Sequence, residues 1–407
     1  MHDRRMSALR IGIVGLGAIG EKHARSLAAA ASRHCVLSAV ACAVPANADR
    51  LSAELRVPGF ASAEELFASG TCDAVLLATP HFWHPPLTIK AARAGLHVLS
   101  EKPLAVTVGA ARQASATCRA NRVALGVMFQ QRLRPVVQQA REMLVKGVVG
   151  DLVQVEATCS AWTRTQAYYA VSPWRGTWNG EGGGVLMNQA PHTLDLFIWL
   201  GGMPASVFAR VSTRIHSIEV ENTAELLCGY PDAGKFGHLY VTTAQAPGVE
   251  RLLLVGEKAS LELGADGLRV ARLPSPLREH LLHCPRTGSE EGHLPAVWET
   301  VACEPDRDDD HVRVIEAFAR HVREGAPMVA DSDDGIRQVE LTNAAYVSGH
   351  RNRPITFPLS AAAVERWLSA RVRQSRRPGQ GLRETAGKEL RRLLRSCLLY
   401  TSPSPRD

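Results

Sequence analysis

Short hydrophobic runs alternate with amphipathic stretches through the first 130 residues. The runs are rich in aliphatic and β-branched residues, which predicts buried strands, at 9–15, 36–41, 73–80, 97–100 and 123–128. Helical stretches separate them, one ending near residue 31 and another covering 85–94 before Gly95. Strands that alternate with helices predict an α/β fold with a doubly wound parallel sheet of the Rossmann type, whose ligands bind at the carboxyl ends of the strands.

The pattern changes after residue 130, where several strands follow one another without long helices between them. Helices are predicted over 135–146, 312–323 and 335–348. Strands are predicted between them and near the end, over 152–161, 206–212, 224–230, 236–243, 251–255, 259–263 and 354–358. Gly234 and Gly256 lie between consecutive strands, a position typical of hairpin turns.

The chain has 407 residues, too many for one ordinary core, so two domains are expected, over 1–130 and 131–360. Its hydrophobic and charged fractions, 45% and 21%, are typical of a globular protein. No apolar run approaches the ~20 residues that a membrane-spanning helix needs. The nine cysteines are scattered and none forms a Cys-x-x-Cys pair, which argues against a metal site and a disulfide framework. This cysteine usage predicts a reducing compartment, the cytoplasm.

The formal charge of +7 belongs to one end of the chain. Residues 361–407 hold 11 Lys and Arg and 4 Asp and Glu, which leaves 36 of each kind in residues 1–360. The body is therefore formally neutral, and its charge predicts neither a nucleic-acid nor a membrane partner. The last eleven residues, CLLYTSPSPRD at 397–407, match one reading frame of a common sequencing adapter. We expect a basic tail over 361–407 whose end is a cloning or assembly artefact.

A glycine-rich turn follows the first predicted strand and opens the first helix, with the sequence Gly15, Leu16, Gly17, Ala18, Ile19, Gly20. In such a turn the first glycine permits the tight bend and the second lets the backbone approach a pyrophosphate. The third packs helix on strand, so that free N–H groups at the helix N-terminus face the anion. Because strand, turn and helix occur in the required order, the turn predicts a dinucleotide cofactor.

The residues after the second strand do not show which dinucleotide binds. An Asp or Glu about 20 residues past the glycines usually holds the free ribose 2′-hydroxyl of NAD. This chain has Cys42, Ala43, Val44 and Pro45 there, with no carboxylate to repel a 2′-phosphate. Arg50 is a candidate partner for that phosphate, and a solvated helix arginine is the competing interpretation. The sequence leaves the cofactor as NAD or NADP.

Four motifs share order and spacing with one protein family. They are GLGAIG (15–20) followed by His23, ATPHFWH (78–84), AGLHVLSEKP (94–103) and GGGVLMNQAPH (182–192). Together they resemble the Gfo/Idh/MocA oxidoreductases over nearly all of residues 8–359. The resemblance implies a Rossmann domain followed by an α/β domain with an open, mostly antiparallel sheet. It also implies hydride transfer between a nicotinamide cofactor and an alcohol or ketone carbon, and the stretch 168–177 is most similar to members that act on sugars, sugar nucleotides or cyclitols.

Oxidising a secondary alcohol requires a base for the hydroxyl proton and a charge that stabilises the developing alkoxide. The family context makes His192 the candidate base or acid, because an unperturbed imidazole titrates near neutral pH. Lys102, at a strand end, is expected to hydrogen-bond the reacting oxygen. Asn188 lies four residues before His192 on a predicted helix and shares its face. The family commonly has Asp at this position, so the hydrogen bonding is kept here and the charge is lost.

Further residues are assigned to the site in the same way. The cofactor is expected to contact the glycine turn and also Cys42, Thr79, Pro80, His84, Glu101 and Lys102. The substrate is expected to contact Lys102, Asn188 and His192, and also residues of an aromatic cluster, Tyr169, Trp174 and Arg175. Aromatic rings stack on sugars, and Arg164 with Arg175 can clamp a phosphate or carboxylate. A core patch with surface arginines is the competing interpretation. Asp195 is expected either to orient His192 or to form a structural pair.

Two alternative functions stay open at this stage. Some relatives of this fold are glycoside hydrolases that hold NAD tightly for transient oxidation. Others have lost catalysis and act as cofactor-sensing regulators, although the presence of both Lys102 and His192 argues against this. In either case the expected partner is a small sugar-like molecule, and the resemblance implies a homo-oligomer, a dimer or tetramer formed through the exposed face of the second sheet.

Overall fold

The computed structural model describes residues 8–172, 174–231, 234–287 and 292–375. Its first domain is built on a six-stranded parallel sheet in the order β3-β2-β1-β4-β5-β6. The strands are β1 (Leu9–Val14), β2 (Cys35–Ala41), β3 (Gly59–Phe60), β4 (Ala74–Leu77), β5 (His97–Ser100) and β6 (Leu125–Val127). This order is that of a doubly wound Rossmann sheet, so the predicted fold of the first domain is confirmed.

Five helices connect the strands of this sheet, as the alternating pattern predicts. They are α1 (Ala18–Ala29), α2 (Pro45–Leu55), α3 (Ala63–Ala68), α4 (His84–Arg93) and α5 (Val108–Ala120). A single 3₁₀ turn, η1 (His81–Trp83), precedes α4, and a second, η2 (Gln130–Leu133), follows β6. The switch point of the strand order lies between β1 and β4, so the ends of β1, β4 and β5 open into the crevice where such sheets bind their ligands.

The second domain has a nine-stranded sheet in the order β14-β13-β12-β11-β7-β10-β9-β8-β15. Its strands are β7 (Leu152–Cys159), β8 (Ser206–Ser212), β9 (Thr223–Gly229), β10 (Phe236–Thr242), β11 (Glu250–Gly256), β12 (Ala259–Gly264), β13 (Gly267–Arg272), β14 (Trp298–Val301) and β15 (Ile355–Thr356). Strands β7 and β10 pair in parallel, and the other pairs are antiparallel. The mostly antiparallel second sheet is therefore confirmed, while β13 and β14 were not predicted.

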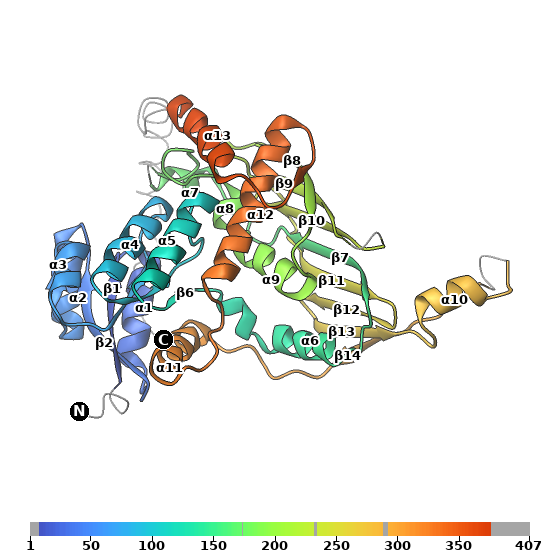
Figure 1. Cartoon of the computed structure of the whole chain (residues 1–407), viewed down its shortest axis with the longest axis horizontal. Helices are drawn as coiled ribbons and strands as arrows, with labels where there is room; N and C mark the ends of the chain where they lie inside the picture. Colours follow the sequence, from blue (N-terminus) through green and yellow to red (C-terminus); the bar gives the residue numbers. More distant parts are fainter. Residues whose placement is uncertain (1–7, 173, 232–233, 288–291, 376–407) are drawn as a thin grey trace, which may run out of the picture.

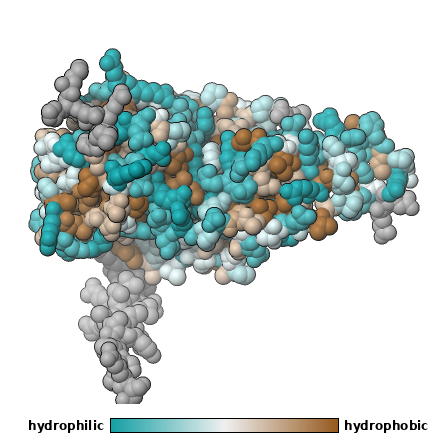
Figure 2. Space-filling model, turned by 90° about the horizontal axis from the view of Figure 1, so that it is seen from below, coloured by the Kyte–Doolittle hydropathy of each residue, from teal (hydrophilic) through white to brown (hydrophobic). Residues whose placement is uncertain are grey.

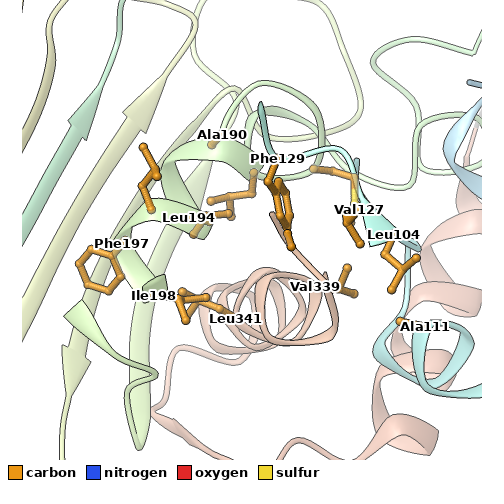
Figure 3. Packing of buried hydrophobic residues seen from close by; sticks show 14 of the residues in the cluster. Leu104, Ala111, Val127, Phe129, Ala190, Leu194, Phe197, Ile198, Val339 and Leu341 are labelled. Atoms are coloured by element: carbon orange, nitrogen blue, oxygen red, sulfur yellow. The ribbon is translucent and has the colours of Figure 1, made fainter. Parts of the chain in front are cut away.

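Most helices of the second half lie on one face of this sheet or between it and the first domain, and one short helix, α10, projects beyond the end of the sheet (Figure 1). They are α6 (Pro135–Val145), α7 (Gln166–Ala170), α8 (Val185–Asn188), α9 (Pro191–Gly201), α10 (Leu277–His283), α11 (Asp310–Glu324), α12 (Ser332–Arg351) and α13 (Ala361–Gln374). Helix α12 contacts β8, α9 and α5, so it lies between the two sheets. Its Val339 and Leu341 pack with Phe129, Leu194 and Leu104 in one continuous core (Figure 3).

Two helices lie where the sequence did not place them. Helix α11 follows the second sheet in the chain, yet its Ile315 and Phe318 are buried in the core beside β1 of the first domain. Helix α13 begins the segment expected as a basic tail, and its Trp367 stacks on Tyr346 of α12 with ring centroids 5.6 Å apart. The expected artefact at 397–407 lies outside the described residues.

Among the described residues, no helix is both long enough and apolar enough to cross a bilayer. On the face that is seen from below, hydrophobic and hydrophilic residues are interspersed (Figure 2). This mixture is ordinary for a folded protein surface, where apolar atoms contribute more than half of the accessible area.

Candidate active site

The glycine turn between β1 and α1 has the geometry of a phosphate cradle. Gly15 has φ +92°, and a Cβ there would lie 2.8 Å from the Ala78 carbonyl oxygen, so β4 approaches it closely. A Cβ on Gly20 would lie 1.8 Å from the Gly15 carbonyl oxygen. A Cβ on Gly17 would meet nothing within 4 Å, and Gly17 caps α1 without a side-chain hydrogen bond. The first and third glycines are therefore required by packing, whereas the second leaves open space before the free N–H groups of α1.

Glu101 is held in a fixed position beside this cradle. Its Oε1 lies 2.7 Å from His23 Nε2, and its Oε2 accepts the backbone N–H of Lys102 at 3.1 Å. Burial opposes ionisation of this carboxyl, but the hydrogen bond from His23 prevails and lowers the pKa of Glu101 to about 2. Glu101 thus presents a fixed negative charge at the end of β5.

Lys102 comes next and reaches across to the second domain. Its Nζ donates a hydrogen bond to the Asn188 carbonyl oxygen at 2.8 Å. Burial lowers the pKa of Lys102, and the charges of Glu101 and Glu181 oppose that effect. The side-chain amide of Asn188 in turn donates to Glu181 Oε1. Lys102 and Asn188, 86 residues apart in the chain, are therefore brought into one hydrogen-bonded group.

Asn188 and His192 do not lie on one helix, and this prediction is wrong. Helix α8 ends at Asn188, residues 189 and 190 follow, and α9 begins at Pro191. The break has a local cause, because Pro191 lacks the N–H that would continue the helical hydrogen bonds. Ala190 before it keeps right-handed helical backbone angles, and its N–H donates to the Val185 carbonyl oxygen. Both residues nevertheless border Lys102, since Asn188 accepts its hydrogen bond and the Lys102 charge acts on His192.

His192 is a buried imidazole with one open hydrogen-bonding position. Its Nε2 lies 3.3 Å from the Gln130 side-chain nitrogen, and its Nδ1 is buried without a partner among the described residues. Burial, and then the charge of Lys102, lower the pKa of His192 to about 3. The ring is therefore neutral at physiological pH and able to accept a proton. The ring of Phe129 meets it edge-on, with centroids 6.0 Å apart.

A second group of side chains lies at the predicted aromatic cluster. Arg164 and Arg175 both approach the Tyr168 ring, with guanidinium carbons 4.5 and 4.4 Å from its centroid. Arg175 also lies 4.7 Å from the centre of the Trp174 ring and bonds the Tyr168 hydroxyl. The charges of both arginines lower the pKa of Lys102, so this cationic group lies near Lys102.

The cluster is not one aromatic platform, because two of its rings are committed elsewhere. Trp178 is buried against Tyr346 and Trp367, which belong to α12 and α13. The Tyr169 hydroxyl lies 2.9 Å from Thr243 Oγ1, and its ring is buried. A substrate contact of Tyr169 stays a prediction. Tyr168 is the ring that both arginines approach, and its hydroxyl accepts a hydrogen bond from Arg175.

Other predicted residues have structural partners of their own. Asp195 accepts hydrogen bonds from Arg132 at 2.6 and 2.8 Å, so it forms the structural pair and not a contact that orients His192. Arg50 pairs with Glu21 at 2.7 Å, which already balances its charge. Cys42 is buried at the end of β2 and its Sγ accepts the Val44 N–H at 3.5 Å. No carboxylate side chain occurs at 42–44 of the sequence.

His84 and its neighbours tie the first domain's loops together. The His84 ring lies 2.8 Å from the Pro103 carbonyl oxygen and 2.7 Å from that of Thr79. It thereby connects the loop after β4, which contains Thr79 and Pro80, to the loop after β5, which contains Lys102. His84 therefore fixes the two loops of the predicted cofactor site relative to each other.

Three residues of the site were not predicted: His81, Gln130 and Glu181. Glu181 is buried and bonds Asn188, while its carbonyl oxygen lies 3.0 Å from His81 Nδ1. Gln130 contacts His192. Glu181 had a weak signal in the sequence, since a carboxylate between glycines, GEGGG at 180–184, is unusual for a solvated charge. Gln130 and His81 had none, because their positions depend on how the two domains meet.

Comparisons with known proteins identify the family. Residues 9–129 match the family model described as an oxidoreductase family with an NAD-binding Rossmann fold, and residues 137–262 match the Gfo/Idh/MocA C-terminal domain. The chain belongs to the Gfo/Idh/MocA oxidoreductases. It is therefore an NAD(P)-dependent oxidoreductase, and neither the hydrolase nor the non-catalytic alternative is favoured. Its relatives include a D-glucoside 3-dehydrogenase and an inositol 2-dehydrogenase.

Individual relatives show how far the likeness extends. The rhizopine catabolism protein MocA of Rhizobium meliloti is 31% identical over 51% of this chain, a match that spans 62% of its own length. The D-glucoside 3-dehydrogenase of Escherichia coli is 25% identical over 84% of this chain and 95% of its own. Among solved structures, the WlbA dehydrogenase of Bordetella pertussis, in complex with NADH and UDP-GlcNAcA, has a TM-score of 0.72 at 28% identity, covering 87% of this chain and all of that one.

The residues present fit a nicotinamide dinucleotide. The open space at Gly17 suits a pyrophosphate at the N-terminus of α1. Thr79 Oγ1, Gln130 Oε1 and His192 Nδ1 are buried polar atoms without partners among the described residues, which leaves hydrogen-bonding positions for a cofactor and a substrate. In the same part of the chain, no group of three or more His, Cys, Asp or Glu side chains is arranged to hold a metal ion.

Proposed function

We propose that the protein interconverts a secondary alcohol and a ketone of an anionic, sugar-like substrate. The observation that carries this proposal is the meeting of Lys102, Asn188 and His192 at the carboxyl end of β5, beside the glycine cradle. NAD(P), when bound, supplies the acceptor for the hydride that leaves the alcohol carbon. Side chains of this protein bind the substrate, stabilise the charge on its oxygen and transfer the proton.

Lys102 and His192 have different roles in the reaction, since Lys102 stabilises charge on the substrate oxygen and His192 transfers the proton. The Lys102 ammonium hydrogen-bonds the substrate oxygen and stabilises the negative charge that develops there. His192, neutral at physiological pH, accepts the hydroxyl proton at its unprotonated ring nitrogen. In the reducing direction Lys102 again hydrogen-bonds the oxygen, and the protonated His192 returns the proton to it as the hydride arrives at the carbon.

The charge of the site supports an anionic substrate. Lys102, Arg164 and Arg175 bring three cationic side chains to one region, and Glu181 is buried beneath them. The Nε of Arg164 is buried without a partner in the described part of the chain. Arginine binds carboxylates and phosphates bidentately, so uronic acids and nucleotide sugars are the classes we propose. The similar WlbA dehydrogenase, whose complex contains UDP-GlcNAcA, supports this choice.

A substrate screen tests the proposal directly. Thermal-shift measurements with NAD and NADP, each combined with polyols, aldoses, uronic acids and nucleotide sugars, are expected to show stabilisation by acidic members in the presence of cofactor. Hits are then assayed for the change in NADH or NADPH absorbance. Stabilisation by neutral polyols alone, with turnover of those compounds, would reject the anionic class while leaving dehydrogenation intact.

Replacing Arg175 with alanine is expected to raise KM for an acidic substrate by roughly 10- to 100-fold, because a charge-assisted hydrogen bond is worth about 1.5–3 kcal/mol. The kcat value is expected to change much less, since Arg175 does not reach the reacting carbon in this proposal. Arg119, an exposed arginine paired with Asp333, provides the matched control variant, Arg119→Ala. An unchanged KM in Arg175→Ala would rule out the clamp.

We also propose a homo-oligomer in the cytoplasm. The outer face of the second sheet exposes Phe208, Leu227 and Phe236 by 36%, 55% and 58%. Phe208 and Leu227 are cross-strand partners on β8 and β9, so they form one apolar surface that a second copy would cover. Light scattering is expected to give at least a dimer, and Leu227→Asp is expected to shift it towards monomer. A wild-type monomer would contradict the assembly. The free cysteines support the cytoplasmic location.

A further inference from the structure

Glu181 is a buried carboxylate held at several points in the loop before α8. Its side chain is 1% exposed. Oε2 accepts the Gly176 N–H at 2.6 Å, and Oε1 accepts from the Asn188 amide. The nearest Arg175 nitrogen lies 4.0 Å from Oε1. The loop itself has little freedom, because Gly182 has φ +80° and a Cβ there would lie 2.3 Å from Val106 Cγ1.

The first domain holds the same loop in place. The Glu181 carbonyl oxygen lies 3.0 Å from His81 Nδ1, and His81 belongs to η1, directly after the loop that follows β4. The ring of His81 also meets that of Trp174, with centroids 5.7 Å apart. Glu181 therefore occupies a defined position at the junction of both domains.

Ionisation of Glu181 in this buried position costs solvation free energy. Burial raises the pKa of Glu181, which means that the ionised form is penalised, and the hydrogen bonds and neighbouring cations offset this only in part. A glutamine would have the same shape and would accept the Gly176 N–H without that penalty. A carboxylate differs from that amide in two ways, because it accepts at both oxygens, from Gly176 and from Asn188, and because it carries a negative charge.

Lys102 is the cation on which the negative charge of Glu181 acts. Its ammonium donates to the Asn188 carbonyl, a neutral acceptor, and lies in the field of Arg164 and Arg175. Two carboxylates oppose these cations, Glu101 and Glu181. Glu101 is already engaged by His23 at 2.7 Å. Glu181 is the second negative charge. The residue Asn188 contacts both groups, because its side-chain amide donates to Glu181 and its backbone carbonyl accepts from Lys102.

We propose that Glu181 is a positioning residue, which fixes the carboxamide of Asn188 and supplies the negative charge that balances the Lys102 ammonium. This inference rests on the proposed function, in which Lys102 acts on the substrate oxygen. Asn188 is neutral where the family commonly has an aspartate, and Glu181 supplies a negative charge near that position. The carboxylate acts on Lys102 through its charge and through Asn188, whose backbone carbonyl accepts the Lys102 hydrogen bond, and it does not touch the reacting atoms.

The charged groups around Lys102 determine in which direction its pKa changes when Glu181 is neutralised. Burial and the positive charges lower its pKa, while the two carboxylates raise it. The groups that share an electrostatic interaction with Lys102 are Glu101, Glu181, Arg164, Arg175, His81, His84, His192 and His311. Removing the Glu181 charge takes away one of the two raising contributions, so Lys102 will lose its proton at lower pH.

The test measures Lys102 directly and needs no turnover. The chain has seven lysines, so reductive methylation with ¹³C-formaldehyde gives a resolvable set of NMR signals, and Lys102→Met assigns the one of interest. In Glu181→Gln, the Lys102 signal is expected to titrate at a pKa about one unit lower, equivalent to a roughly tenfold change in its proton affinity. Glu221→Gln is the matched control, because Glu221 is also buried and accepts the N–H groups of Gly184 and Leu186.

Kinetics provide the second readout on the same proteins. The fall in kcat/KM at high pH is expected to begin at lower pH in Glu181→Gln, while the dissociation constant for NADH stays unchanged. Glu181→Asp serves as a further variant, because it keeps the charge and shortens the reach to Asn188, so kcat is expected to fall without a shift in the profile. An unchanged Lys102 titration in Glu181→Gln overturns the inference. If the wild type oxidises none of the acidic sugars, the proposed function fails, but the titration still decides the role of Glu181.

Discussion

Replacing Lys102 with methionine is expected to lower kcat by about 1000-fold or more, because charge stabilisation in a water-excluded site is worth roughly 4 kcal/mol. Methionine keeps the length and much of the volume of the lysine stem but cannot donate a hydrogen bond to the substrate oxygen. Without the ammonium, negative charge on that oxygen is met only by neutral groups. The measurement is single-turnover formation of NADH or NADPH with a saturating substrate.

The same variant is expected to bind cofactor normally and to fold. Lys102 is buried enough that its charge carries a solvation penalty, so a neutral side chain relieves that cost even though the bond to Asn188 is lost. Fluorescence titration is expected to give a dissociation constant for NADH within about threefold of the wild type, a difference below 1 kcal/mol. Lys90→Met is the control, because Lys90 is exposed and pairs with Glu64. A Lys102→Met enzyme with near-normal kcat would refute the assignment.

The position of Lys102 was predictable because it depends on local and repeating patterns. Strand, glycine turn and helix at 9–29 identify the cradle, and alternating strands place the end of β5, with Glu101 and Lys102, at the ligand-binding edge of a parallel sheet. Each of these inferences uses only hydrophobic periodicity and the restricted geometry of a glycine turn. The overall fold of the second domain was likewise predictable, through the resemblance and the alternation along its strands.

The partners of Lys102 were not predictable, because they depend on how distant segments meet. Asn188 presents its backbone carbonyl to Lys102, and no side-chain pattern encodes that contact. The break between α8 and α9 was missed because the four-residue spacing of Asn188 and His192 was given more weight than Pro191 between them. Glu181 was missed because its electrostatic interaction with Lys102 arises only where the two domains meet.

Helix α11 shows the same limit on a larger scale. Its apolar positions predicted an amphipathic helix, and the structure has one at Asp310–Glu324. Periodicity shows that a helix has a buried face but not which core receives that face. Ile315 and Phe318 pack beside β1, so a segment that follows the second sheet completes the first domain. Strands β13 and β14 were missed for a simpler reason, since their exposed charged residues weaken the hydrophobic pattern.

Replacing His192 with asparagine is expected to lower kcat by roughly 100- to 10,000-fold, the usual contribution of a positioned general base. Asparagine keeps a polar side chain that can contact Gln130, but it cannot take up a proton. Because burial and Lys102 lower the pKa of His192 to about 3, the wild-type ring is neutral and has a free lone pair throughout the range from pH 5 to 8. Single-turnover rates in the oxidising direction measure this loss.

A pH series distinguishes a lost base from a distorted site. The folded protein holds His192 neutral down to a pKa of about 3, whereas the unfolded chain takes up a proton near pH 6.5. Wild-type stability therefore falls as the pH decreases through this window, and His192→Asn is expected to lose less stability over the same range, because it lacks one such proton. If the variant lost kcat and NADH binding together, the site would be distorted and the base assignment unsupported. Loss of kcat alone, with the shallower acid dependence of unfolding, would assign the proton transfer to His192.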